Sequence, residues 1–176
     1  MVIGAVASGF ELVDLDGMTH RLADYTGEIV VLDFWSAECP WSSNYDGWLS
    51  QHASGWARQG IRLLAIASNV NESVVYIRET VAERNITFPV LLDDGCAVAD
   101  LYGALTTPHI FVIDPAGRLA YQGAIDDRSF RQREASVNYL EQALAALLAG
   151  GQPNPAHTDS YGCTIVRPVA EQGITA

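Results

Sequence analysis

The sequence predicts an α/β domain in which helices flank a mixed central sheet. Two near-continuous apolar runs, Ile29–Trp35 and Ile61–Ala67, are typical of central strands that are covered on both faces. Each run is followed by a segment expected to be helical, and this alternation implies a partly parallel sheet. The turn signal between His109–Ile113 and Leu119–Gly123 predicts a closing antiparallel hairpin, which makes the sheet mixed.

The other elements follow from local signals along the chain. Alternation on both sides of Asp16-Gly17 predicts an N-terminal hairpin over residues 10–13 and 18–22. Pro40 suits the first turn of a helix and Gly60 ends one, so a helix is expected over 40–59. The remaining expected elements are a helix over 72–84 with Asn71 as its N-cap, a strand over 88–92, a short helix over 96–101 and a last helix over 136–149.

Length and composition predict one domain with an appendage. The 176 residues divide into an expected domain over 1–149 and a Gly/Pro linker with a cysteine-containing tail over 150–176. The net charge of −11 argues against binding to nucleic acid or to anionic membranes. The compartment stays open: the cytoplasm or, if a signal segment has been removed, the periplasm. The oligomeric state is also left open.

One stretch, from Asp33 to Ser42, carries most of the chemical information. It places Cys39 where an apolar strand gives way to the start of a helix. The free N–H groups and the dipole of a helix start favour an anion, here a thiolate, which is the reactive form of cysteine. Cys39 is therefore the expected nucleophile.

Three separated features resemble one family. They are Asp33-Phe34-Trp35 followed by Cys39, then Thr106-Thr107-Pro108 before a strand, and then the hairpin from Phe111 to Gly123. Over residues 5–149 the chain resembles the thioredoxin-like redoxin family, meaning TlpA-like thiol-disulfide oxidoreductases and their peroxiredoxin relatives. The resemblance implies a thioredoxin fold with an N-terminal hairpin and an inserted strand-helix segment. It also implies a cis bond before Pro108, facing the reactive cysteine.

The active-site motif departs from the family at one position, because Ser42 stands where a second cysteine is usual. Ser42 either donates a hydrogen bond to the Cys39 thiolate or is an exposed helix serine. Asp33 matches the buried carboxylate that shuttles a proton in thioredoxins, or it keeps only a structural role. The resolving thiol is then Cys163 or an external thiol, since the residues after Ala149 can span roughly 45 Å against a radius of gyration of about 15 Å for such a domain.

Further residues are assigned by the resemblance or by their neighbours in sequence. The resemblance implies that Pro40, Trp41, Thr107 and Pro108 line a substrate groove. Cys96 and His109 are expected to be packed in the core. His157 and Cys163 fall short of a zinc signature, so neither a metal nor a cofactor is expected.

The sequence thus predicts a thiol-disulfide oxidoreductase that acts through Cys39 on protein or small-molecule thiols and disulfides. One alternative is a thiol peroxidase, but Leu32 stands where the peroxiredoxin pattern requires proline. The other alternative is a binding module that keeps the fold without turnover.

Overall fold

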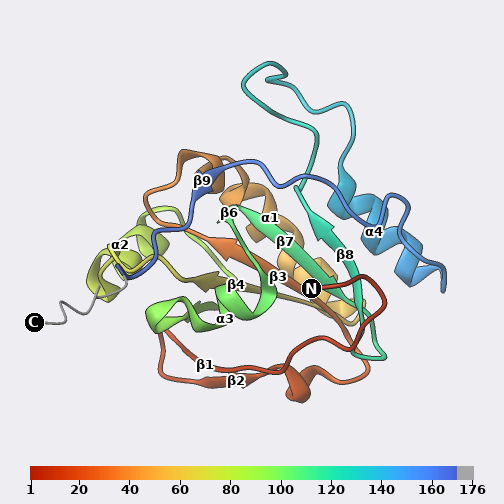
Figure 1. The fold of residues 1–176 in the computed structure, drawn as a ribbon, viewed down its shortest axis with the longest axis horizontal. Helices are drawn as coiled ribbons and strands as arrows, with labels where there is room; N and C mark the ends of the chain where they lie inside the picture. The colour runs from red at the N-terminus through yellow and green to blue at the C-terminus, as the bar shows by residue number, and fades with distance from the viewer. Residues whose placement is uncertain (170–176) are drawn as a thin grey trace, which may run out of the picture.

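A seven-stranded mixed sheet forms the centre of the computed structural model, which describes residues 1–169 (Figure 1). In the sheet order β2-β1-β5-β4-β3-β7-β8, β3 and β5 run parallel to β4, and β7 runs antiparallel to β3. The predicted α/β class with a mixed sheet is confirmed. The strands are β1 (Glu11–Asp14), β2 (Thr19–Arg21), β3 (Ile29–Trp35), β4 (Ile61–Ala67), β5 (Val90–Leu92), β7 (His109–Ile113) and β8 (Leu119–Gly123).

Helices cover both faces of the sheet. Odd-numbered residues of β3, such as Val31 and Trp35, pack against α1, α2 and α4, whereas Leu32 and Phe34 pack against α3 and the N-terminal segment. Burial of each large apolar side chain contributes about 1.5–3 kcal/mol, so β3 is held firmly between the two layers. The helices are α1 (Pro40–Arg58), α2 (Val74–Glu83), α3 (Ala97–Tyr102) and α4 (Tyr139–Leu148), with short 3-10 turns at Leu22–Tyr25 and Asp94–Cys96.

Two helices begin later than the sequence pattern suggests, because capping decides where a helix starts. The α2 helix begins at Val74, and the side chain of Ser73 rather than Asn71 accepts the capping hydrogen bond. The α4 helix begins at Tyr139, where Asn138 caps it by accepting from the N–H of Glu141.

The tail is packed on the domain through a small second sheet that the sequence does not predict. In it, β9 (Cys163–Thr164) pairs antiparallel with β6 (Thr106–Thr107). In Figure 1 the blue tail crosses the end of the main sheet on its way to β9. The boundary at residue 149 stays a prediction. Within residues 1–169 no helix combines the length and apolar character needed to cross a membrane.

Candidate active site

Cys39 lies between β3 and α1, where it is the N-cap residue of the helix. Its side chain is almost completely buried, with 1% exposed. Its Sγ is 3.0 Å from the carbonyl oxygen of Thr107 and 2.7 Å from Sγ of Cys163. The peptide bond between Thr107 and Pro108 is cis, as the family resemblance implies. The structure therefore brings together two cysteines and the segment before Pro108.

Glu72 holds the loop that leads into Cys39, and the sequence analysis missed it. Its carboxylate accepts hydrogen bonds from the Ser36 hydroxyl and from the backbone N–H groups of Ala37 and Glu38. Ser36 Oγ in turn accepts the N–H of Cys39 at 3.1 Å. Glu72 is far from Cys39 in sequence and belongs to no motif, so only the fold reveals this support.

The surroundings of the two sulfur atoms favour opposite protonation states. Burial alone would raise the pKa of Cys39. Interactions with its surroundings, foremost with the Cys163 thiol and then with the backbone N–H groups of Ser42 and Cys163, outweigh burial, so the pKa of Cys39 is lowered. Burial, together with the contact with Cys39, raises the pKa of Cys163 to about 12. The surroundings therefore favour the thiolate form at Cys39 and the thiol form at Cys163.

Three buried polar atoms near Cys39 have no hydrogen-bond partner within the described residues: Asp33 Oδ1, Ser42 Oγ and Thr107 Oγ1. Ser42 is buried, with 1% exposed, so the interpretation of Ser42 as an exposed helix serine is wrong. The other interpretation, a hydrogen bond from the Ser42 hydroxyl to Cys39, is also wrong, because this hydroxyl has no partner among residues 1–169. The backbone N–H of Ser42 supports the thiolate instead. Burial, followed by the charges of Asp46 and Cys39, raises the pKa of Asp33 well above its usual range.

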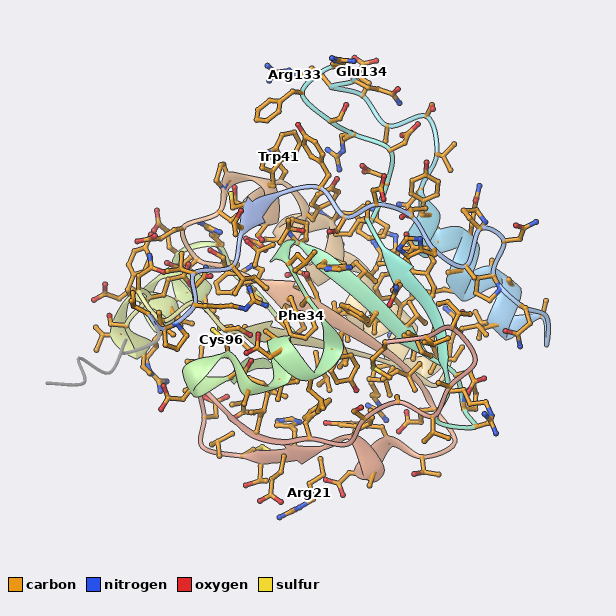
Figure 2. The ribbon with its side chains drawn as sticks, in the orientation of Figure 1. Arg21, Phe34, Trp41, Cys96, Arg133 and Glu134 are labelled. Atoms are coloured by element: carbon orange, nitrogen blue, oxygen red, sulfur yellow. The ribbon has the colours of Figure 1, made fainter. Side chains whose placement is uncertain are left out.

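The residues expected to line a groove beside Cys39 differ in exposure, and two of them contact other parts of the chain. Pro40 is exposed and Trp41 is half-buried. The Trp41 ring packs edge-on against Phe130 and Tyr161, with centroids 5.5 Å and 4.9 Å away. Phe130 belongs to the projecting loop whose tip carries Arg133 and Glu134 in Figure 2, and Tyr161 belongs to the tail. Thr107 is buried and pairs with Cys163 of β9.

Cys96 and His109 are buried, as expected. The Cys96 thiol donates to the carbonyl of Ser68 at 2.8 Å, in the core on the α3 side. His109 accepts from the N–H of Leu105 through Nδ1, and burial lowers the pKa of His109 to about 4. Both side chains are thus buried and hydrogen-bonded to the backbone.

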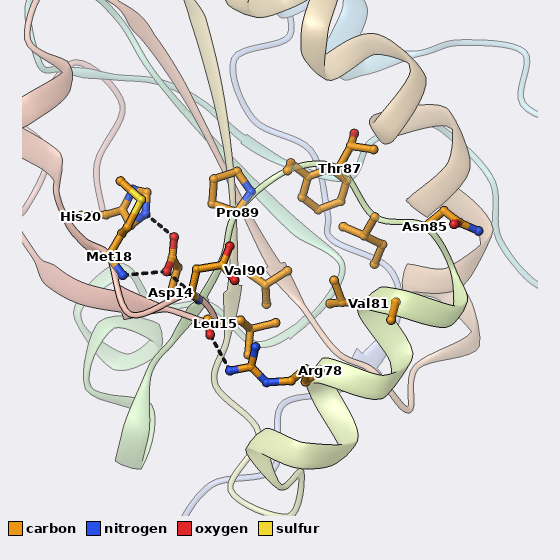
Figure 3. A pocket seen from close by; sticks show the side chains of 14 residues that line it. Asp14, Leu15, Met18, His20, Arg78, Val81, Asn85, Thr87, Pro89 and Val90 are labelled. Atoms are coloured by element: carbon orange, nitrogen blue, oxygen red, sulfur yellow. Dashed lines mark hydrogen bonds and ion pairs between the residues drawn. The ribbon is translucent and has the colours of Figure 1, made fainter.

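A separate pocket of about 700 Å³ lies between the N-terminal hairpin and α2 (Figure 3). At its wall Asp14 accepts hydrogen bonds from the backbone of Met18 and pairs with His20, while Arg78 donates to the carbonyl of Leu15. Neither Cys39 nor Cys163 lines this pocket. The candidate active site is therefore the buried sulfur pair and not the larger hollow.

The chain is similar to known proteins both in sequence and in fold. The thiol-disulfide oxidoreductase ResA of Geobacillus thermodenitrificans is 31% identical over 119 residues, which cover 68% of this chain and 67% of the relative. A hypothetical protein of Sinorhizobium meliloti superimposes with a TM-score of 0.87 at 29% identity, covering 97% of both chains. A chain described as a putative thiol:disulfide interchange protein DsbE, from Chlorobium tepidum, gives a TM-score of 0.71 at 26% identity over 84% of this chain and 99% of its own.

The thioredoxin-like fold is thus shared with proteins named as thiol-disulfide oxidoreductases, which are distant homologues of this chain. The model of the AhpC/TSA family matches residues 3–122, from the N-terminal segment to β8. This span includes Cys39, Asp33 and the cis-proline segment. The chain therefore belongs to the AhpC/TSA family of thioredoxin-like redoxins.

Proposed function

We propose that the protein is a thiol-disulfide oxidoreductase in which Cys39 is the nucleophile and Cys163, from the tail, is the resolving thiol. The observation that carries the proposal is the 2.7 Å approach of the two sulfur atoms. Cys163 thereby takes the part of the second cysteine that Ser42 replaces. The opposite pKa shifts of the two thiols support this division of roles.

In the reductive direction, the Cys39 thiolate attacks one sulfur of a substrate disulfide. A bond forms between Cys39 and that sulfur, and the other substrate sulfur leaves as a thiolate. Cys163 then loses its proton and attacks Cys39, which releases the second substrate thiol and forms the Cys39–Cys163 disulfide. Two electrons pass from the cysteine pair to the substrate, and an external dithiol must reduce the pair again.

The change of charge at Cys39 assists the second step. The contact with Cys39, through its hydrogen bond and its negative charge, helps to raise the pKa of Cys163. Once Cys39 is in a mixed disulfide, that charge is gone, so Cys163 is more easily deprotonated. The resolving thiol is therefore more reactive towards the mixed disulfide than it is beside the free Cys39 thiolate.

Disulfide mapping tests the proposal. The reduced protein is oxidised mildly, digested and analysed by mass spectrometry, and a peptide pair linking Cys39 to Cys163 is expected. In Cys163→Ser, a mixed disulfide between Cys39 and an added disulfide substrate should accumulate instead. Cys96→Ser is the matched control and should behave like the wild type. Absence of the linked pair, or release of both substrate thiols by reduced Cys163→Ser in a single turnover without added thiol, would refute the resolving role.

A peroxidase assay separates the competing activity. Hydrogen peroxide consumption with a thiol reductant is measured beside the reduction of a peptide disulfide. The proposal expects rapid disulfide reduction and slow peroxide consumption, both of them lost in Cys39→Ser. Rapid peroxide turnover with negligible disulfide exchange would assign the site to a thiol peroxidase.

A further inference from the structure

We propose that the tail is an internal copy of the preferred target. That target is an extended polypeptide with glycine immediately before its reactive cysteine and an aliphatic residue two positions after it. It binds along β6 in place of β9. This inference rests on the proposed function, since it names the class of substrate that reacts with Cys39.

The backbone of the tail occupies β6 as an added strand. Thr107 is paired with Cys163, and Thr106 with Thr164, in antiparallel register. The pairing continues where the N–H of Ile165 donates to the carbonyl of Leu105 at 3.0 Å. Backbone pairing accepts any extended chain, and side-chain pockets then select the sequence. This strand position places a cysteine sulfur directly on Cys39.

Gly162 makes the position before the cysteine specific for glycine. A Cβ added to Gly162 would lie 2.0 Å from the carbonyl oxygen of Thr107 and 2.6 Å from its carbonyl carbon. Those atoms belong to the backbone of β6, next to Pro108, so no side-chain rotation relieves the clash. A target that pairs in the same register must therefore have glycine there.

Ile165 makes the second position after the cysteine specific for an aliphatic residue. Its side chain is 2% exposed and lies in the α3-side core with Phe34, Cys96 and Ala104. Thr164, between Cys163 and Ile165, is exposed and points away from this core. Side chains alternate along a strand, so the intermediate position tolerates any residue.

The same geometry makes target and tail mutually exclusive. Because Cys39 is 1% exposed beneath the tail, a target reaches it only when β9 leaves β6. After the mixed disulfide has formed, return of β9 to β6 displaces the target strand and brings the Cys163 sulfur to Cys39. One strand exchange thus couples product release to the second thiol-disulfide step.

A panel of peptides tests whether the tail is a copy of the preferred target. Peptides containing Gly-Cys-Thr-Ile, Ala-Cys-Thr-Ile, Gly-Cys-Thr-Asp and Gly-Cys-Lys-Ile are prepared as mixed disulfides with thionitrobenzoate and added to full-length Cys163→Ser. Attack of Cys39 on the peptide sulfur releases thionitrobenzoate, which is followed by absorbance, and mass spectrometry verifies the Cys39–peptide bond. Rates are divided by those of each peptide with dithiothreitol, which corrects for intrinsic reactivity.

The Gly-Cys-Thr-Ile and Gly-Cys-Lys-Ile peptides should react at similar rates. The Ala and Asp peptides should react at least about tenfold more slowly, a ratio that corresponds to roughly 1.4 kcal/mol. If all four rates agree within about twofold while Cys39 still reacts, the tail is not a copy of the preferred target, and the proposed function stands. If Cys39 reacts neither with the peptides nor with dithiobis(nitrobenzoate), the proposed function fails, and the proposal about the tail fails with it.

A variant of the tail itself gives a second readout. Gly162→Ala should dislodge β9 and increase the rate of iodoacetamide modification of Cys39 about tenfold, the ratio expected for a loss of roughly 1.4 kcal/mol. Thr164→Ala, at the neighbouring exposed position, is the matched control and should leave that rate unchanged. Equal iodoacetamide rates in Gly162→Ala and the wild type would overturn the requirement for glycine at position 162.

Discussion

Cys163 Sγ lies 2.7 Å from Cys39 Sγ although 124 positions separate the two residues in the chain. The strand pairing between β9 and β6 holds this contact, since Cys163 is directly opposite Thr107, whose carbonyl oxygen also contacts Cys39. The second thiol beside Cys39 thus comes from the tail, whereas the usual family motif has it at the position of Ser42. This difference determines which variants are informative.

Removal of the Cys163 thiol should raise the pKa of Cys39. Cys163→Ala deletes a hydrogen bond that favours the Cys39 thiolate, so the thiolate is less stabilised and the pKa of Cys39 rises. Cys163→Ser keeps a donor and should shift the pKa less. Iodoacetamide rates across pH measure both, with Cys96→Ser as control. An identical pKa in Cys163→Ala and the wild type would mean that Cys163 does not stabilise the thiolate.

Ser42→Cys should restore a local dithiol and divert Cys39 from Cys163. Ser42 Oγ is buried and makes no hydrogen bond within the described residues, so a sulfur atom there breaks no existing bond. After mild oxidation, we expect peptide mapping to find mainly a disulfide between Cys39 and the introduced cysteine. Ser42→Ala is the control: it should retain the Cys39–Cys163 disulfide and leave stability unchanged or increased by about 1 kcal/mol. Continued dominance of the Cys39–Cys163 pair in Ser42→Cys would contradict the expectation.

The sequence predicts the centre of this fold well because burial on both faces leaves a simple pattern. The strands Ile29–Trp35 and Ile61–Ala67 have the bounds that their apolar runs predict. The start of α4 is predicted too early, because the N–H groups of Ser136 and Val137 bond to the distant carboxylate of Asp127 instead of starting a helix. Helical spacing alone does not reveal that competition.

Some residues of the candidate site can be predicted from the local sequence, whereas others depend on contacts between distant segments. Cys39 and Thr107 are placed by motifs that the local chain carries. The strand pairing of Cys163 and the support from Glu72 depend on contacts between distant segments. A two-residue strand such as β9 has no periodicity to detect, so reach alone could make Cys163 a candidate.

Glu72→Gln should loosen the loop before Cys39. The Oε2 atom of Glu72 accepts the N–H of Ala37 at 3.0 Å, and Oε1 accepts from Ser36 and Glu38. An amide can offer an acceptor to only one of these sides, so we expect a loss of roughly 1–3 kcal/mol. Urea unfolding measures the loss. Glu79→Gln, an exposed change on α2, is the control and should stay within about 0.5 kcal/mol of the wild type. Equal stability of the two variants would show that Glu72 is not a support.

Asp33→Asn should stabilise the protein at neutral pH. Because burial raises the pKa of Asp33 above its ordinary value of 3.8, the folded state favours the protonated carboxyl, and folding becomes less favourable as pH rises through that raised value. The neutral amide removes this cost, so the gain should be present at pH 7 and vanish below about pH 3.8. Thermal unfolding should show a rise of roughly 2–4 °C for each kcal/mol recovered. A gain that is the same at both pH values would contradict the assignment.

His109→Asn should remove part of the acid sensitivity of the fold. Burial lowers the pKa of His109 from 6.5 to about 4, so between these values the unfolded chain binds a proton that the folded chain excludes. Stability should therefore be fully present above pH 6.5 and fall by about 3 kcal/mol as the pH drops to 4. The Asn side chain offers an acceptor to the N–H of Leu105 without titrating, so the variant should lack this portion of the decline.

Urea unfolding at several pH values between 4 and 7 measures the His109 contribution as the difference between the slopes of the two proteins. Equal slopes for His109→Asn and the wild type would mean that His109 is protonated inside the fold. Its contact with the N–H of Leu105 would then have to be broken, because a protonated imidazole has no acceptor to offer.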